Sequence, residues 1–315
     1  MKKSFHAYDT YNVIDVRDEV SESVLMETIE EAMRLEHMLS AFRPDGEVGR
    51  INRNAGYKET QVSQETCHLL KKAIAYSQQT NGAFDITIRP AVRLWNDGYK
   101  TGCLPNENEL EKIKNLIDYR KIHINMETST VLLEEKGQEI DLGGIAKGYA
   151  ADVIRSRLKE NGVKNGIINF GGTVLTIGKN PNGNPWRVGI QNPGMKRGHS
   201  IGSMQVGEAS VVTSAVNERF FIKDNKLYHH LLDPFTLRPS QSGLYSVTAI
   251  GYDAADLDAV TTGLFVMGLE KGVDLANKIG LDAVFLKADG SIYSTQKISN
   301  MILIKERGSH YGKEN

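Results

Sequence analysis

The chain has 315 residues, of which 40% are hydrophobic and 24% are charged, and its formal net charge is −1. This length allows a sizeable core, and the near-zero net charge excludes a nucleic-acid binder that depends on neutralising phosphates. No segment has the roughly 18 consecutive apolar residues of a membrane-spanning helix, so we expect no membrane insertion. The two cysteines, Cys67 and Cys103, exclude a disulfide framework and a cysteine-based zinc site.

The first half of the chain predicts one strand followed by helices. Residues 4–17 alternate imperfectly, as in a strand, and the next apolar residues recur at helical spacing. Ser63 is the expected N-cap of one helix, and Asn106 opens another. Residues 82–90 read as a junction from a helix to a strand. The predicted helices cover residues 24–39, 64–80 and 106–116, and a hairpin of residues 122–124 and 131–133 follows.

Beyond residue 160 the chain consists of short β-like runs separated by Gly, Asn and Pro. One long helix, at about residues 255–279, interrupts them. Because helices and strands do not alternate regularly, the pattern predicts an α+β fold rather than a doubly wound parallel sheet. The predicted strands cover residues 166–170, 173–177, 186–190, 201–206, 210–213, 219–222, 245–250, 282–286 and 301–304.

A glycine-rich turn is the most informative local feature. Residues 140–152 read Ile-Asp-Leu-Gly-Gly-Ile-Ala-Lys-Gly-Tyr-Ala-Ala-Asp, a strand end that passes through glycines into a helix. Such a turn lets a ligand approach the backbone, and a helix N-terminus favours an anion. The spacing is neither the Walker pattern nor the dinucleotide fingerprint. The residues alone therefore leave two interpretations, a phosphate site near Lys147 or an ordinary tight turn.

Asp258 and Thr262 are four residues apart near the start of the last predicted helix, so their oxygens share one face. A carboxylate and a hydroxyl suit Mg²⁺, which prefers oxygen ligands. The alternative is structural, with Asp256 as N-cap and Asp258 as a first-turn acid that the helix dipole stabilises.

The segment of residues 228–234 contains two adjacent histidines before an Asp-Pro turn. His229 and His230 would point to opposite faces of a strand, so at most one faces a given site as a base or phosphate ligand. The Gly pair of residues 169–173 offers another close backbone approach, or simply a tight hairpin.

Taken together, these segments resemble the ApbE family of FAD:protein FMN transferases, and the resemblance runs through nearly the whole chain in order. It implies an α+β fold with a β-rich core related to the T-fold and a helical lobe, with FAD held between the two. We expect residues 1–315 to form one catalytic unit, with the lobe at roughly 20–120 and the body at roughly 121–305 plus the N-terminal strand. The matching segments are residues 9–10, 39–52, 82–90, 94–95, 141–152, 169–173, 186–190, 212–214, 230–234 and 258–268.

The resemblance implies a Mg²⁺-dependent transfer of FMN from FAD to a Ser or Thr hydroxyl of a target flavoprotein, with release of AMP. The metal ligands would be the carbonyl oxygen of Gly144 and the side chains of Asp258 and Thr262. Asp141 and Lys147 would contact FAD, with Lys147 near the pyrophosphate as a catalytic charge.

The other site residues also follow from the resemblance. His230, rather than His229, would be the catalytic base. Phe42 would offer a stacking surface beside the adenosine, and Leu232 would lie against the flavin. The adenosine region would be lined by Ala83, Phe84 and Asp85.

Two departures from the family pattern accompany these matches. The early Met-Gly-Thr motif reads Tyr8-Asp9-Thr10 here, and the Thr-Ser-Gly motif ends in Ala215. Two alternatives stay open, an FAD pyrophosphatase that yields FMN and AMP, and a non-catalytic flavin-binding protein. The N-terminus lacks the apolar region of a signal peptide and a lipobox cysteine, so on the assumption that Met1 is the natural start we expect a cytoplasmic location.

Overall fold

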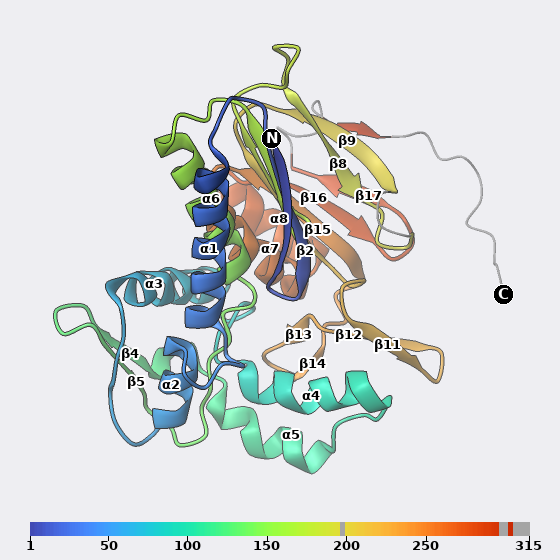
Figure 1. Ribbon diagram of the computed structural model, residues 1–315. Helices are drawn as coiled ribbons and strands as arrows, with labels where there is room; N and C mark the ends of the chain where they lie inside the picture. The colour runs from blue at the N-terminus through green and yellow to red at the C-terminus, as the bar shows by residue number, and fades with distance from the viewer. Residues whose placement is uncertain (196–198, 296–301, 305–315) are drawn as a thin grey trace.

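The computed structural model describes residues 1–195, 199–295 and 302–304, and its centre is an eight-stranded antiparallel sheet (Figure 1). The strand order is β1-β2-β6-β7-β10-β15-β16-β17. This sheet confirms the expected α+β class. Its strands are β1 (Lys2–Ala7), β2 (Thr10–Val16), β6 (Gly166–Phe170), β7 (Thr173–Ile177), β10 (Ser210–Ala215), β15 (Leu244–Gly251), β16 (Asp282–Lys287) and β17 (Ile292–Ser294).

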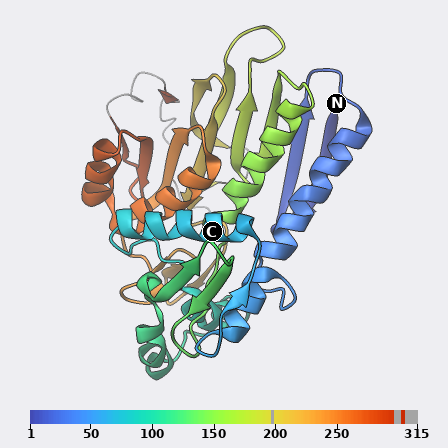
Figure 2. The ribbon, with the colours of Figure 1, turned by 90° about the vertical axis from the view of Figure 1, so that its left-hand side faces the viewer.

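Helices cover one face of this sheet (Figure 2). They are α1 (Glu22–Leu39), α6 (Ala146–Glu160), α7 (Ala254–Met267) and α8 (Leu269–Lys278). Apolar side chains from both layers form one core, in which Ile14, Ile154 and Phe285 are fully buried. Among the helices of the described part of the chain, none is long and apolar enough to cross a membrane.

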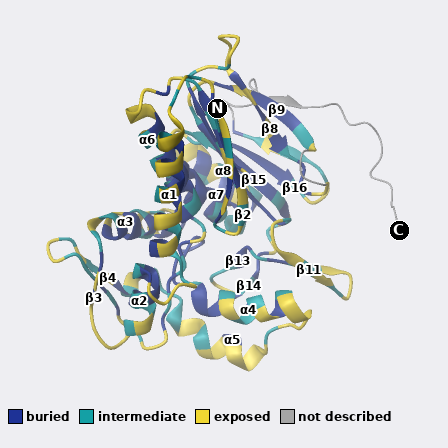
Figure 3. Cartoon of the chain, in the orientation of Figure 1, coloured by how far each residue is buried: buried dark blue, intermediate teal, exposed yellow. Residues whose placement is uncertain are grey.

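A small sheet of β8 (Trp186–Gln191), β9 (Ser200–Val206) and β18 (Ile302–Ile304) covers the opposite face. Neighbouring residues of β10 divide between the two layers, because Val211 packs with the small sheet and Val212 with the helices. This is the alternation of side chains that a strand buried on both faces requires. Figure 3 shows the resulting buried interior of the large sheet.

The remaining elements lie below the sheet in Figure 1. Among them, Trp95 donates its indole N–H to the carbonyl of Leu237 at 2.7 Å, and its ring stacks on Tyr228 at 5.8 Å. The elements are α2 (Glu47–Asn54), α3 (Gln64–Gln79), α4 (Arg89–Thr101), α5 (Glu107–Ile113), the 3₁₀ turns η1 (Lys114–Leu116) and η2 (Tyr119–Lys121), the sheet β3 (Thr60–Gln61)–β5 (Thr130–Leu133)–β4 (Ile122–Asn125), and the hairpins β11 (Phe220–Lys223)–β12 (Lys226–His229) and β13 (Leu232–Asp233)–β14 (Arg238–Pro239).

Many predicted elements are confirmed. Ser63 and Asn106 cap α3 and α5, each accepting a hydrogen bond from a backbone N–H of the first turn. β6 and β7 have the predicted bounds. Residue 301 of the last predicted strand lies outside the described residues. Helix α1 packs on α6 and β1, and the division into a lobe and a body stays a prediction.

Three predicted elements were wrong. The strand at residues 4–17 is two strands, because Tyr8 and Asp9 both take φ 56° and turn the chain. The helix at residues 255–279 breaks at Gly268, whose φ of 79° and ψ of −179° lie outside the helical region. The junction at residues 82–90 leads into α4 rather than a strand, with Pro90 in the first helical turn.

Candidate active site

Helix α7 places Asp258 and Thr262 on one face, as their spacing predicts. Asp258 is 3% exposed, and the Thr262 hydroxyl donates to its backbone carbonyl at 3.2 Å. The Asp258 carboxylate accepts the backbone N–H of Gly148 through Oδ2 at 3.1 Å, and its Oδ1 lies 3.5 Å from Nζ of Lys147. The carboxylate is therefore held by the turn that sequence analysis singled out.

The glycine-rich turn lies directly against α7. A Cβ atom added to Gly144 would lie 3.6 Å from Oγ1 of Thr262 and 3.1 Å from the ring of Phe84. The Gly148 N–H, whose usual helical acceptor would be the Gly144 carbonyl, donates to Asp258 instead. Within the described ranges, no hydrogen bond to that carbonyl is found. Gly144 thus lies beside Thr262, in the turn that also holds Asp258.

These oxygens suit a hard cation. A further oxygen, which the sequence pattern did not indicate, is Oγ of Ser214, and it lies 3.2 Å from Oγ1 of Thr262. No group of three His, Cys, Asp or Glu side chains in the described residues could hold a metal. A cation here would depend on one carboxylate, neutral oxygens and water, which is the donor set that Mg²⁺ accepts. Ala215, the departure beside Ser214, pairs regularly with Ser246 and leaves β10 intact.

His230 follows β12 and lies close to Lys147. Burial lowers the pKa of His230 to about 3, aided by the nearby His229 and by the positive charges of Arg219 and Lys147. Its Nδ1 is buried and finds no hydrogen-bond partner among the described residues. The ring is therefore neutral near pH 7 and able to accept a proton. His229 instead bonds the Ser240 carbonyl through Nε2 at 3.1 Å, so the two rings have different surroundings, and the role of His230 as a base stays a prediction.

Arg89, which sequence analysis missed, joins two predicted site residues. Its guanidinium lies 3.2 Å from Oδ2 of Asp141 and stacks 3.8 Å from the ring centroid of Phe42. Oδ1 of Asp141 accepts the Gly143 N–H at 2.8 Å, which shapes the turn. Phe42 is 57% exposed although one face of its ring is covered, so it retains a free surface for stacking. The one sequence feature that could have indicated Arg89 is its position directly before Pro90.

The segment of residues 83–85 lies beside the glycine turn, because the Asp141 N–H donates to the carbonyl of Ile86 at 2.7 Å. The Asp85 carboxylate accepts the backbone N–H groups of Thr87 at 2.8 Å and Tyr119 at 3.1 Å. Burial raises the pKa of Asp85, and these bonds oppose the rise. Asp85 thus shapes its own loop. Its predicted contact with FAD, and those of the buried Ala83, Phe84 and Leu232, stay predictions.

The chain is similar to proteins of one family. The model of the ApbE family matches residues 8–285. A protein of Klebsiella pneumoniae (strain 342) named FAD:protein FMN transferase is 36% identical, over 82% of this chain and 80% of that protein. The protein of Treponema pallidum (strain Nichols) with the same name is 31% identical, over 85% of this chain and 78% of that protein.

Solved structures agree with this fold. The ApbE protein of Thermotoga maritima superposes with a TM-score of 0.87 at 29% identity, covering 96% of this chain and 98% of that one. A point mutant of flavin transferase ApbE from Vibrio cholerae gives a TM-score of 0.85 at 26% identity, covering 96% of this chain and 99% of that one. The likeness extends over both the sheet and the elements below it.

Proposed function

We propose that this chain, which belongs to the ApbE family, is an FAD:protein FMN transferase that moves FMN from FAD to a Ser or Thr hydroxyl of a target flavoprotein. The observation that supports this most is the meeting of the α6 glycine turn with Asp258 and Thr262 of α7. It puts an anion-favouring helix N-terminus, a lysine and a set of oxygen ligands at one place.

The metal ligands in this proposal are Asp258, Thr262 and the Gly144 carbonyl, with Mg²⁺ as the ion. When bound, Mg²⁺ supplies positive charge to the phosphate oxygens and to the leaving AMP. Lys147 would add a fixed charge beside the pyrophosphate, and its Nζ lying 3.5 Å from the proposed metal ligand Asp258 supports this role.

The FAD would extend along the residues of the turn and the loop beside it. Phe42, backed by Arg89, offers a stacking surface for the adenine. Ala83, Phe84 and Asp85 would line the rest of the adenosine region. Asp141, which accepts the Gly143 N–H and so orders the turn, would face the pyrophosphate. Leu232 would pack against the flavin.

His230 is the proposed base. The acceptor hydroxyl oxygen attacks the phosphorus of the FMN moiety, the bond from this phosphorus to the AMP oxygen breaks, and the hydroxyl proton passes to His230. The free ring is a weak base because its pKa is lowered to about 3. The negative charge of bound FAD would raise this pKa, since an opposite charge favours the protonated imidazole.

The test is to incubate the protein with FAD, Mg²⁺ and an acceptor flavoprotein domain that carries a single candidate Ser or Thr. Intact mass should show addition of FMN, and AMP should appear in equal amount. An acceptor with that residue changed to Ala, and a reaction in EDTA, are the controls. Equal AMP release without acceptor, and no gain in mass with it, would identify an FAD pyrophosphatase instead. The cytoplasmic location is a separate proposal, which cell fractionation tests.

A further inference from the structure

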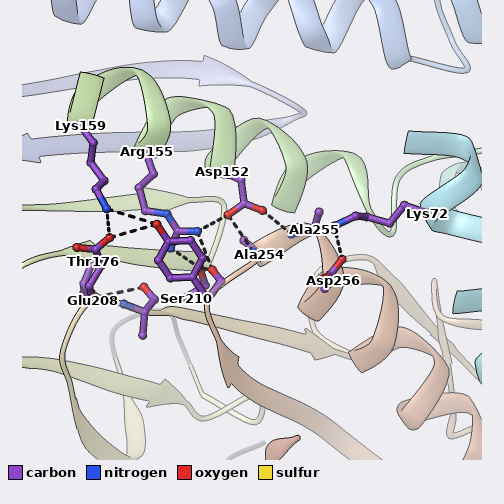
Figure 4. A network of polar contacts seen from close by, with 12 residues as sticks. Lys72, Asp152, Arg155, Lys159, Thr176, Glu208, Ser210, Ala254, Ala255 and Asp256 are labelled. Carbon is purple, nitrogen blue, oxygen red and sulfur yellow. Dashed lines mark hydrogen bonds and ion pairs between the residues drawn. The ribbon is translucent and has the colours of Figure 1, made fainter. Parts of the chain in front are cut away.

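A buried network ties α6 to the first residues of α7 (Figure 4). The Asp152 carboxylate accepts the backbone N–H of Ala254 at 3.0 Å and that of Ala255 at 2.9 Å. Helix α7 begins at Ala254, and its own N-cap residue, Asp253, makes no side-chain capping bond. Asp152 therefore caps α7 from a neighbouring helix, satisfying two of the N–H groups that a helix start leaves without partners.

Arg155 holds this carboxylate in place. It is 2% exposed, and its Nη2 donates to Oδ1 of Asp152 and to the carbonyl of Tyr252, both at 2.7 Å. Its Nη1 donates to Oγ of Ser210 at 2.9 Å, and its guanidinium stacks 4.0 Å from the Tyr252 ring centroid. A planar guanidinium with partners on several sides is fixed in orientation. The network thus fixes Tyr252, two residues before α7, as well as the first turn of the helix.

The same contact between α6 and α7 contains the candidate metal site. Asp258 lies one helical turn after Ala254, and Gly148 lies one turn before Asp152. A Cβ atom on Gly148 would lie 2.2 Å from the Ala254 carbonyl oxygen, so the two backbones touch. The Gly148 N–H then donates to Asp258. Any slip of α7 along α6 would move Asp258 relative to Lys147.

We propose that Asp152 is a positioning residue, whose cap, held by Arg155, sets α7 against α6 so that Asp258 meets the metal beside the Lys147 turn. This inference rests on the proposed function, because it takes Asp258 as a metal ligand. Residues that orient a ligand without touching the metal typically change affinity or activity about 10–100-fold.

The test measures metal binding directly. Mn²⁺, which accepts the same oxygen ligands as Mg²⁺, is titrated calorimetrically into wild type and Asp152→Asn. The measurements are made at about pH 8, because burial raises the pKa of Asp152 to about 6. The amide of Asn keeps one acceptor oxygen but loses the second and the charge opposite Arg155. We expect the Kd for Mn²⁺ to rise about 10–100-fold, while FAD binding in EDTA stays at the wild-type level.

Asp256→Asn is the matched control. It removes one carboxylate charge from the first turn of α7, the turn that Asp152 caps from α6, at a position where Asp256 pairs with Lys72 at 2.6 Å on the surface. We expect wild-type Mn²⁺ affinity for this variant. Wild-type affinity in Asp152→Asn, or an equal loss in both variants, would overturn the positioning role.

Arg155→Lys is the milder second variant, because lysine cannot reach Asp152, Ser210 and Tyr252 together. It should also weaken Mn²⁺ binding and speed amide exchange at residues 254–258. If Asp152→Asn does not fold, Arg155→Lys becomes the deciding variant. Unchanged Mn²⁺ affinity and unchanged amide exchange in Arg155→Lys would then overturn the proposal. A wild-type protein that binds no Mn²⁺, or an Asp258→Ala variant that binds it normally, overturns the proposed metal site instead.

Discussion

Replacing Asp258 with Ala separates the stability role of this residue from its proposed metal role. The carboxylate is 3% exposed and accepts the Gly148 N–H at 3.1 Å. Removing it leaves a buried N–H without an acceptor, which costs about 1–3 kcal/mol. The Lys147 side chain is 28% exposed, so losing this ion pair adds only about 0–1 kcal/mol. We expect the free energy of unfolding to fall by about 1–4 kcal/mol, with the fold retained.

The proposed metal role is tested by the stabilisation that Mg²⁺ adds, which is measured separately from the stability lost through the substitution itself. A ligand at 100 times its Kd stabilises the folded state by about 2.7 kcal/mol. Denaturant unfolding with and without Mg²⁺ should show such a gain in wild type and none in Asp258→Ala, and FMN transfer should be abolished. Asp256→Asn is the control for charge on the same helix. An equal gain from Mg²⁺ in Asp258→Ala, or full transfer activity in EDTA, would refute the reasoning.

Three other perturbations test separate parts of the structure. Phe42→Ala should raise the KM for FAD about 5–150-fold, since stacking of a base on an aromatic ring contributes about 1–3 kcal/mol. Steady-state kinetics check this, and an unchanged KM contradicts it. Gly148→Ala should destabilise the fold by about 1–3 kcal/mol, because the new Cβ atom would lie 2.2 Å from a carbonyl oxygen. Gly207→Ala is the control and should not destabilise the fold, because Gly207 has open space around it. Thermal denaturation of the two variants checks this. His230 has a lowered folded pKa of about 3, so the unfolded state binds its proton first, and stability should fall by up to about 1.4 kcal/mol per unit as pH drops from about 6.5 towards 3. In His230→Asn this part of the pH dependence should disappear.

The local part of the site could be predicted from sequence. Helical spacing alone put Asp258 and Thr262 on one face, and the turn composition marked Lys147. The resemblance then connected the two segments. Their buried hydrogen bond through Gly148 could not be derived, because it joins residues 110 positions apart. For the same reason the burial of Asp258 could not be predicted, because the local sequence pattern alone indicates an exposed acid in the first turn of a helix.

Other residues were missed because their roles depend on distant partners. Arg89 is held by Asp141, 52 positions away, and Ser214 lies against Thr262 of α7, 48 positions away. The turn at Tyr8 and Asp9 was missed for a different reason. Residues other than glycine rarely take a positive φ, and pairing of β1 with β2 outweighs that local preference here.

The antiparallel pairing of the large sheet has a consequence for how the protein is made. β2 pairs with β6, so Asn12 meets Phe170 only after more than half of the chain has been synthesised. Contacts between residues so distant in sequence form late, because closing a long loop costs entropy before any pairing repays it. Helix α7 follows later still, at residues 254–267. A nascent chain would thus lack the proposed metal site at Asp258 until α7 has docked on α6, and if that proposal is right, metal affinity would report completed folding.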